Sequence, residues 1–180
     1  MATARAAITD EDLLRLPKDG HKYEVVDGEL RMSPAGLLHE LVVARLIELL
    51  SAYVRPRRLG MVLGSNVLYV LPSGNKRGPD VSFIAAGRLG EDASEVIFPE
   101  IAPDIAVEVL SPNTSPRKVL DSVGEYLTAG VRLVWVIDPR RRTAAAYRGA
   151  TAVRELGENS ALDGEDVIPG FRCPLTEIFS

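Results

Sequence analysis

The sequence predicts one mixed α/β (α+β) domain in which helices flank a central β-sheet. Short apolar runs of strand length alternate with two longer stretches whose apolar residues recur every three or four positions. Between residues 104 and 137 a strand, a helix and a second strand follow one another, an order typical of a parallel crossover. Predicted hairpins near both ends of the chain add antiparallel pairs, so the sheet should be mixed.

Each element follows from local signals along the chain. In order, we expect a helix over 11–16, a hairpin with strands over 23–26 and 29–32, a helix over 38–53, strands over 61–63, 67–71, 80–84 and 104–110, a helix over 115–129, a strand over 133–137, a second hairpin over 143–147 and 152–155, and a closing segment over 167–171. Residues 86–103 should form a surface excursion. With no linker or internal repeat, residues 1–180 should form a single domain.

Capping residues set the boundaries of the helices. Thr9 and Asp12 resemble a capping box before the first helix. One apolar face runs through the helix over 38–53, which ends before Pro56. In the last long helix, Ser115-Pro116 supplies an N-cap and a proline at the first helical position.

The strands are marked by turns and by apolar runs. Asp27-Gly28 supplies the positive φ angles of a type I′ turn between the first two strands. The runs over 80–84, 104–110 and 133–137 are almost continuously apolar, which is typical of strands buried on both faces. These three strands should therefore form the centre of the sheet.

Composition excludes several classes of protein. With 46% hydrophobic and 26% charged residues in 180 positions, the chain can bury a core and is not of the disordered class. Cys173 is the only cysteine, which excludes a disulfide framework and a multi-cysteine zinc site and favours a reducing cytoplasm. No apolar run approaches the ~18 residues of a membrane span, and residues 1–9 contain no signal-peptide core. We expect a cytoplasmic protein without membrane contact.

The overall charge limits how nucleic acid could be bound. The net charge is −4 and the pI is near 5.3, so contacts with nucleic acid must come from local basic patches. The candidate patches are Arg55/Arg57/Arg58, Lys76/Arg77, Arg117/Lys118 and Arg140/Arg141/Arg142.

Two acidic residues in neighbouring predicted strands are the strongest functional signal. Asp80 opens one apolar strand and Glu108 lies near the end of another, and an unpaired buried carboxylate costs several kcal/mol. Both should therefore be hydrogen-bonded, bound to a metal, or paired with Lys76 or Arg77, and should converge in space. The second Pro-Asp pair contains Asp104, which lies on the strand of Glu108 and roughly 13 Å from it. Asp104 should therefore cap a strand or pair with a basic side chain instead.

Two carboxylates and a backbone carbonyl suit Mg²⁺ or Mn²⁺, because Mg²⁺ takes six oxygen ligands. The carbonyl would be that of Val109, next to Glu108. Such a site is enough to begin phosphodiester hydrolysis. It lacks a cation that orients the attacking water and offsets the charge developing on phosphorus, a task that a lysine normally performs.

Several segments together resemble a known family over nearly the whole chain. They are YEVVDGEL (23–30), SPAG (33–36) before His39, RGPDV (77–81), APDIAVEVLSP (102–112) and the stretch from EYL (125–127) to DP (138–139). The chain resembles the PD-(D/E)XK nuclease superfamily, and within it the Uma-two family of restriction-endonuclease-like proteins.

The resemblance implies a mixed sheet flanked by helices, a magnesium-type site and hydrolysis of nucleic-acid phosphodiesters. It assigns Asp80 and Glu108 to the metal and Glu24, on the N-terminal element, to completing the site. It also implies a lysine on the following helix, four residues before a tyrosine, where this chain has the neutral Ser122. Lys118, one helical turn earlier, is the expected substitute.

The resemblance, together with these residues, implies a magnesium-dependent DNA endonuclease. One alternative is a nuclease-fold protein that binds nucleic acid or regulates without cutting, because Ser122 occupies the usual lysine position. A metal-dependent hydrolase of a small phosphate ester also fits the acidic pI. We further expect a homodimer, from the resemblance and from apolar residues in the edge hairpin, namely Ala144, Ala145, Ala146 and Tyr147.

Overall fold

The computed structural model describes residues 8–17, 21–33, 36–90, 95–112, 115–149 and 151–180. Pro34 and Ala35 of the segment over 33–36, residues 1–7 of the N-terminus and residues 91–94 of the expected surface excursion lie outside the described residues. Within the described part, no helix is both long enough and apolar enough to cross a membrane.

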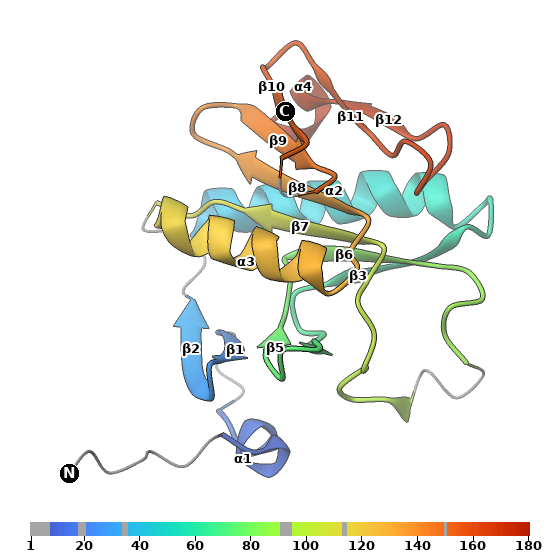
Figure 1. The fold of residues 1–180 in the computed structure, drawn as a ribbon. Helices are drawn as coiled ribbons and strands as arrows, with labels where there is room; N and C mark the ends of the chain where they lie inside the picture. Colours follow the sequence, from blue (N-terminus) through green and yellow to red (C-terminus); the bar gives the residue numbers. More distant parts are fainter. Residues whose placement is uncertain (1–7, 18–20, 34–35, 91–94, 113–114, 150) are drawn as a thin grey trace.

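A six-stranded mixed sheet forms the centre of the molecule (Figure 1). In spatial order its strands are β10 (Val153–Leu156), β9 (Thr143–Tyr147), β8 (Leu133–Asp138), β7 (Ile105–Val109), β6 (Val81–Ala85) and β3 (Gly60–Gly64). The helix α3 (Pro116–Thr128) joins β7 to its parallel neighbour β8, and the other neighbouring strands are antiparallel. The predicted mixed sheet and its parallel crossover are confirmed.

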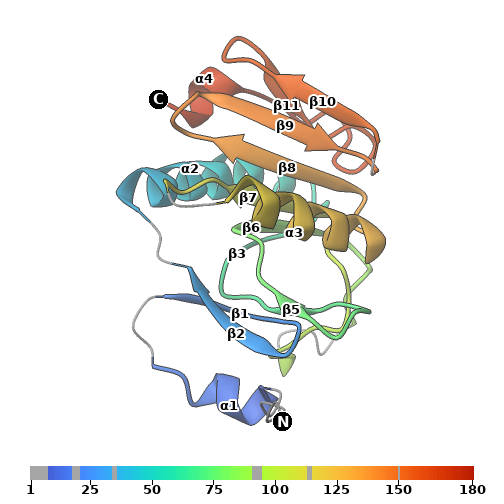
Figure 2. The same ribbon diagram turned by 60° about the vertical axis from the view of Figure 1, so that its left-hand side comes forward.

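Helices cover both faces of this sheet (Figures 1 and 2). The helix α2 (Leu37–Val54) packs on one face, in the larger core that contains Trp135. The helix α3 packs on the other face, in the core that contains Ala106, Val134 and Tyr126. Successive side chains of a strand point to opposite faces, so a strand covered on both sides is apolar at nearly every position. Trp135 and Tyr126 are fully buried, as expected of core residues.

A separate four-stranded sheet lies beside the central one, with the strand order β2-β1-β5-β4 (Figure 2). The strands β1 (Lys22–Val26) and β2 (Glu29–Ser33) form the predicted hairpin, and its turn residues Asp27 and Gly28 have φ angles of 54° and 75°. The strands β4 (Tyr69–Val70) and β5 (Lys76–Arg77) complete this sheet. Only two residues of the predicted strand 67–71 therefore pair as β4, and no sequence signal predicts β5, because two residues show no periodicity.

The predicted cap of the first helix is present. In α1 (Asp10–Leu14), Thr9 Oγ1 accepts a hydrogen bond from Asp12 N at 3.2 Å, and the Asp12 carboxylate accepts one from Thr9 N at 3.0 Å. Ser115 occupies the N-cap position of α3 but its side chain makes no capping hydrogen bond.

The C-terminal part closes the larger core. It contains β11 (Ala161–Asp163), β12 (Arg172–Pro174) and α4 (Leu175–Ile178), and the turn over 167–171 contributes buried apolar side chains between β11 and β12. Ala144 and Ala146 of the edge hairpin are buried in the same core. Core packing therefore accounts for these two alanines, so they lend no support to a dimer contact.

Candidate active site around Asp80 and Glu108

Asp80 lies directly before β6, and the neighbouring strand fixes its carboxylate. Because β6 and β7 are antiparallel, with Val81 opposite Val107, the start of β6 lies beside the end of β7. The Val109 N–H donates to Asp80 Oδ2 at 2.8 Å, and only 3% of Asp80 is exposed. The backbone at the end of β7 thus holds Asp80 next to Glu108.

Lys22, which no sequence motif singles out, contacts both acids. Its Nζ lies 2.9 Å from Asp80 Oδ1 and 3.7 Å from Glu108 Oε2. One ammonium group touches both carboxylates, so the structure brings Asp80 and Glu108 together within reach of a single cation. Lys22 is the first residue of β1 and comes from the smaller sheet, whereas the two acids belong to strand ends of the central sheet.

The fold binds one oxygen of each carboxylate and leaves the other facing Lys22. Asp80 Oδ2, which accepts from Val109 N–H, also lies 3.1 Å from His39 Nε2 near the start of α2. Glu108 Oε1 accepts a hydrogen bond from Tyr126 Oη on α3 at 2.7 Å. His39 therefore belongs to the site, and Tyr126 is both a core residue and a partner of Glu108.

Glu24 approaches the same cluster and is held by residues 77 and 78. Glu24 Oε1 accepts a hydrogen bond from Gly78 N–H at 2.9 Å, and Oε2 lies 3.6 Å from an Arg77 guanidinium nitrogen. A side chain at residue 78 would bring its Cβ to 2.8 Å from the carbonyl oxygen of Ser65. Glycine at this position therefore permits the close packing of residue 78 against Ser65. Lys22 lies two positions before Glu24 and so shares its face of β1. Lys22 was not identified from the sequence, although its place on the same strand face as Glu24 is a signal by which it could have been found.

Crowding of charges shifts the pKa values of the cluster. Burial raises the pKa of Glu108 to about 7; Lys22 opposes this shift, while Asp80 and Glu24 add to it. Burial also raises the pKa of Asp80, but Lys22 and His39 outweigh burial and hold that pKa below its ordinary value. For Lys22 burial lowers the pKa, and the charges of Glu108, Asp80 and Glu24 overcome burial and raise it. At neutral pH Lys22 is therefore an ammonium, Asp80 is a carboxylate and Glu108 is close to its titration point.

Ser122 and Lys118, the α3 residues at and near the expected lysine position, make no ion pair with the site acids among the described residues. Ser122 Oγ donates a hydrogen bond to the Lys118 carbonyl at 3.0 Å, and the Lys118 side chain is exposed. Among the ion pairs of the described residues, none joins Lys118 to Glu24, Asp80 or Glu108. The ammonium observed beside Asp80 and Glu108 is that of Lys22, from β1.

Two residues of the predicted basic patches are used in structural ion pairs. Lys76 Nζ lies 2.8 Å from Asp10 Oδ1, and Arg77 Nε lies 2.7 Å from Glu125 Oε2. We expected Lys76 or Arg77 as a possible ion-pair partner of the two acids, and this expectation is wrong. The lysine that pairs with Asp80 is Lys22, at the start of β1.

The donor set suits a hard divalent cation. Asp80 Oδ1, Glu108 Oε2 and the Val109 carbonyl are all oxygen ligands, and Mg²⁺ commonly uses one or two carboxylates and keeps several waters. A structural zinc site needs about four protein ligands. Over the residues that the structure describes, no group of three or more histidine, cysteine, aspartate or glutamate side chains is placed to hold a metal ion. A site with two carboxylates therefore fits Mg²⁺ or Mn²⁺ and does not fit structural zinc.

Asp104 lies at the other end of the same strand pair. Its Oδ2 accepts a hydrogen bond from Ala85 N–H at 2.8 Å and lies 2.9 Å from an Arg88 guanidinium nitrogen. Both roles expected for Asp104, the strand cap and the pair with a basic side chain, are present.

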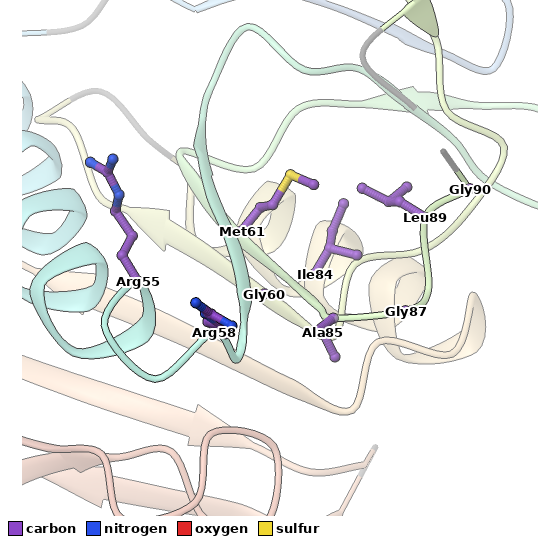
Figure 3. A pocket seen from close by; sticks show the side chains of 10 residues that line it. Arg55, Arg58, Gly60, Met61, Ile84, Ala85, Gly87, Leu89 and Gly90 are labelled. Atoms are coloured by element: carbon purple, nitrogen blue, oxygen red, sulfur yellow. The ribbon is translucent and has the colours of Figure 1, made fainter. Parts of the chain in front are cut away.

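Near this end is an open pocket of about 420 Å³, whose lining residues include Arg55, Arg58, Met61, Ile84 and Leu89 (Figure 3). Among the described residues that line this pocket, none is acidic.

Comparisons with known proteins agree with this architecture. The profile of the Uma2 family, described as "Putative restriction endonuclease", matches residues 10–176. The chain is also similar to a crystal structure of "a putative nuclease belonging to DUF820" from Anabaena variabilis ATCC 29413, with a TM-score of 0.82 and 21% sequence identity, over 96% of this chain and 97% of that chain. No curated protein matches the chain. At this identity the solved structure establishes the shared fold.

Proposed function

This chain belongs to the Uma2 family, and we propose that it is a divalent-metal-dependent nuclease that hydrolyses DNA phosphodiester bonds. The supporting observation is that Asp80 and Glu108 converge from adjacent strand ends, each with one oxygen bound by the fold and one directed to a common cation. Asp80 Oδ1, Glu108 Oε2 and the Val109 carbonyl would hold Mg²⁺ or Mn²⁺.

The chain's own groups orient the reaction. When bound, such a cation supplies Lewis acidity to the phosphate and lowers the pKa of coordinated water. Val109 N–H and Tyr126 Oη fix the two carboxylates, and Glu24, held by Gly78 N–H, adds to the negative charge of the cluster. Hydrolysis forms one bond between a water oxygen and phosphorus and breaks one P–O ester bond, while the water loses a proton and the leaving oxygen gains one.

Nucleic acid must approach this site against an overall charge of −4. Arg117 and Lys118 at the start of α3 are exposed, and we assign them to contacts with the phosphate backbone, which such residues attract electrostatically. Lys118, the catalytic lysine expected from the sequence, is the competing source of positive charge for the reaction itself.

Plasmid nicking measured against Mg²⁺ and Mn²⁺ concentration tests this function. The native chain should nick DNA only when a divalent cation is present, and Asp80→Asn should slow nicking by at least about 10²-fold because a cation ligand is lost. The matched control is Asp104→Asn. It alters the equally buried aspartate of the second Pro-Asp pair and should keep the native nicking rate. Nicking by Asp80→Asn at the native rate would contradict the proposal.

Ser122 keeps a second function open, in which the chain binds DNA without cutting it. This function predicts a gel shift with labelled DNA, no nicking at any divalent concentration, and no effect of Asp80→Asn on the shift. The homodimer and the cytoplasmic location stay predictions. Light scattering that gives the mass of a single chain at micromolar concentration would contradict the homodimer.

A further inference from the structure

The ammonium of Lys22 lies between Asp80 Oδ1 and Glu108 Oε2 and contacts both. Val109 N–H and Tyr126 Oη bind one oxygen of Asp80 and one of Glu108, and Lys22 contacts the other two. The Lys22 side chain is only 15% exposed, so its ammonium interacts mainly with these acids and little with solvent. Lys22 is thus a cation built into the proposed metal site.

Helix α3 reaches the same site without bringing a charge to it. Tyr126 bonds to Glu108, and Ser122 lies about one turn earlier on the same helix. The Ser122 hydroxyl is neutral and donates to the carbonyl of Lys118, one further turn away. The contact of α3 with Glu108 is therefore made by the neutral phenol of Tyr126, and the ammonium beside Asp80 and Glu108 comes from β1.

We propose that Lys22 is the catalytic lysine of this chain, supplied by β1 in place of α3. This inference rests on the proposed function, because it needs a phosphodiester at Asp80 and Glu108. As water attacks phosphorus and the ester bond breaks, negative charge grows on the phosphate oxygens. An ammonium at this point offsets that charge and donates hydrogen bonds to the attacking water, and it neither gains nor loses a proton.

Lys22 also competes with a divalent cation for ligands. Its two contacts are with Asp80 Oδ1 and Glu108 Oε2, the same oxygens that the cation would take. Removing Lys22 should free these oxygens and leave the site more negative, so divalent affinity should rise while turnover falls. A lysine with a purely structural role would give no such opposition, because its loss would weaken both properties.

Two neutral variants test the proposal with two readouts, the affinity for Mn²⁺ alone, measured by calorimetry, and the nicking rate at saturating Mn²⁺. We expect Lys22→Met to bind Mn²⁺ more tightly than the native chain and to nick DNA ~10² to 10³ times more slowly. If Lys22→Met does not fold, Lys22→Gln serves instead, because its amide can still bond to Asp80. Lys22→Arg, which retains the charge, should recover part of the rate. The matched control is Lys76→Met, which removes another partly buried lysine, paired with Asp10, and should change neither readout.

Several outcomes overturn the proposal. Native nicking by folded Lys22→Met or Lys22→Gln would exclude a catalytic role, and a loss of nicking in Lys118→Met would then assign the charge to α3. Weaker Mn²⁺ binding by the neutral variants would show that Lys22 supports the site and does not compete with the cation. If Asp80→Asn abolishes nicking and Lys22→Met does not, only this inference fails. If the native chain shows no divalent-dependent nicking, the proposed function fails with it.

Discussion

Asp80 and Asp104 occupy equivalent positions at opposite ends of the β6–β7 strand pair. Each follows a proline and directly precedes a strand, and each accepts a hydrogen bond at 2.8 Å from the last residue of the neighbouring strand, Val109 for Asp80 and Ala85 for Asp104. Each is 3% exposed. At both ends, therefore, the Pro-Asp sequence caps the antiparallel neighbour.

The two ends differ in the cations that meet the aspartate. Asp104 pairs with Arg88 and lies 3.9 Å from an Arg132 nitrogen, and these arginine side chains are 40% and 43% exposed. The side chains that meet Asp80 are Lys22 and His39, which are 15% and 10% exposed. Exposed ion pairs contribute little, whereas a buried pair responds strongly to any change of charge.

The two ends differ also in the residue beside the capped N–H. Glu108 precedes Val109 at one end, and the equivalent residue at the other end is Ile84, before Ala85. Tyr126, which bonds to Glu108, belongs to the same buried cluster as Ile84, so both positions face the α3 side of the sheet. A Pro-Asp sequence alone is therefore a structural motif, and the second acid and the buried lysine distinguish the candidate active site.

The largest effect is expected when the Asp80 end of the strand pair is made to resemble the Asp104 end. Glu108→Ile should remove one of the two carboxylate ligands of the cation and lower divalent-dependent nicking by ~10² to 10³-fold, with little loss of stability because a crowded acid is removed. Nicking and thermal unfolding should be measured on the same preparation. Retained nicking would show that Glu108 is not a ligand.

The converse change places an acid at the structural end. Ile84 is 2% exposed and belongs to the buried apolar cluster that also contains Ala106 and Val134. Ile84→Glu should therefore lower the free energy of unfolding by about 3 to 5 kcal/mol, measured by urea denaturation, without creating a second nicking activity. The control Ile84→Val removes one methyl group and should cost only about 0.5 to 1.5 kcal/mol. Native stability of Ile84→Glu would show that a second acid is tolerated there as well.

The acid crowding at the active end should appear as a pH dependence of stability. Because the pKa of Glu108 is raised to about 7 in the folded state from an ordinary value of 4.5, the folded state binds more protons than the unfolded state between these values. Stability should fall as pH rises through this window. Relative to the native chain, Glu108→Gln should gain about 1 to 3 kcal/mol on going from pH 4.5 to pH 7.5. The lowered pKa of Asp80 acts in the opposite direction and only in acid, below its ordinary 3.8. Equal pH profiles of the two proteins would contradict the raised pKa.

The smallest effect on nicking is expected when a lysine is placed at Ser122 of α3. If Lys22 already supplies the positive charge, Ser122→Lys should change the nicking rate little, because Asp80 Oδ1 and Glu108 Oε2 are already in contact with an ammonium. Initial rates at saturating Mn²⁺ provide the measurement. An increase on the order of 10²-fold would instead show that the charge was missing and that Lys22 does not supply it.

Much of the fold was predictable because its signals are local. Asp27-Gly28 supplied a turn that needs positive φ angles, Thr9 and Asp12 formed a cap, and the apolar runs on either side of α3 gave the parallel pair. The extent of β4 and the presence of β5 were difficult to predict because each strand contains only two residues, and β5 joins the hairpin through the distant Val25. Their predecessor in the chain, β3, carries a longer apolar run and was predicted.

The sequence by itself determined that Asp80 and Glu108 lie at adjacent strand ends, because strand periodicity and the Pro-Asp position fix where each side chain emerges. It could not determine which cation meets them. Lys22 is 58 positions from Asp80 in the chain, and only the docking of the N-terminal hairpin beside the central sheet places its ammonium 2.9 Å from that carboxylate. Electrostatic interactions depend on distance and burial, which are properties of the packed molecule and leave no pattern in the spacing of the residues.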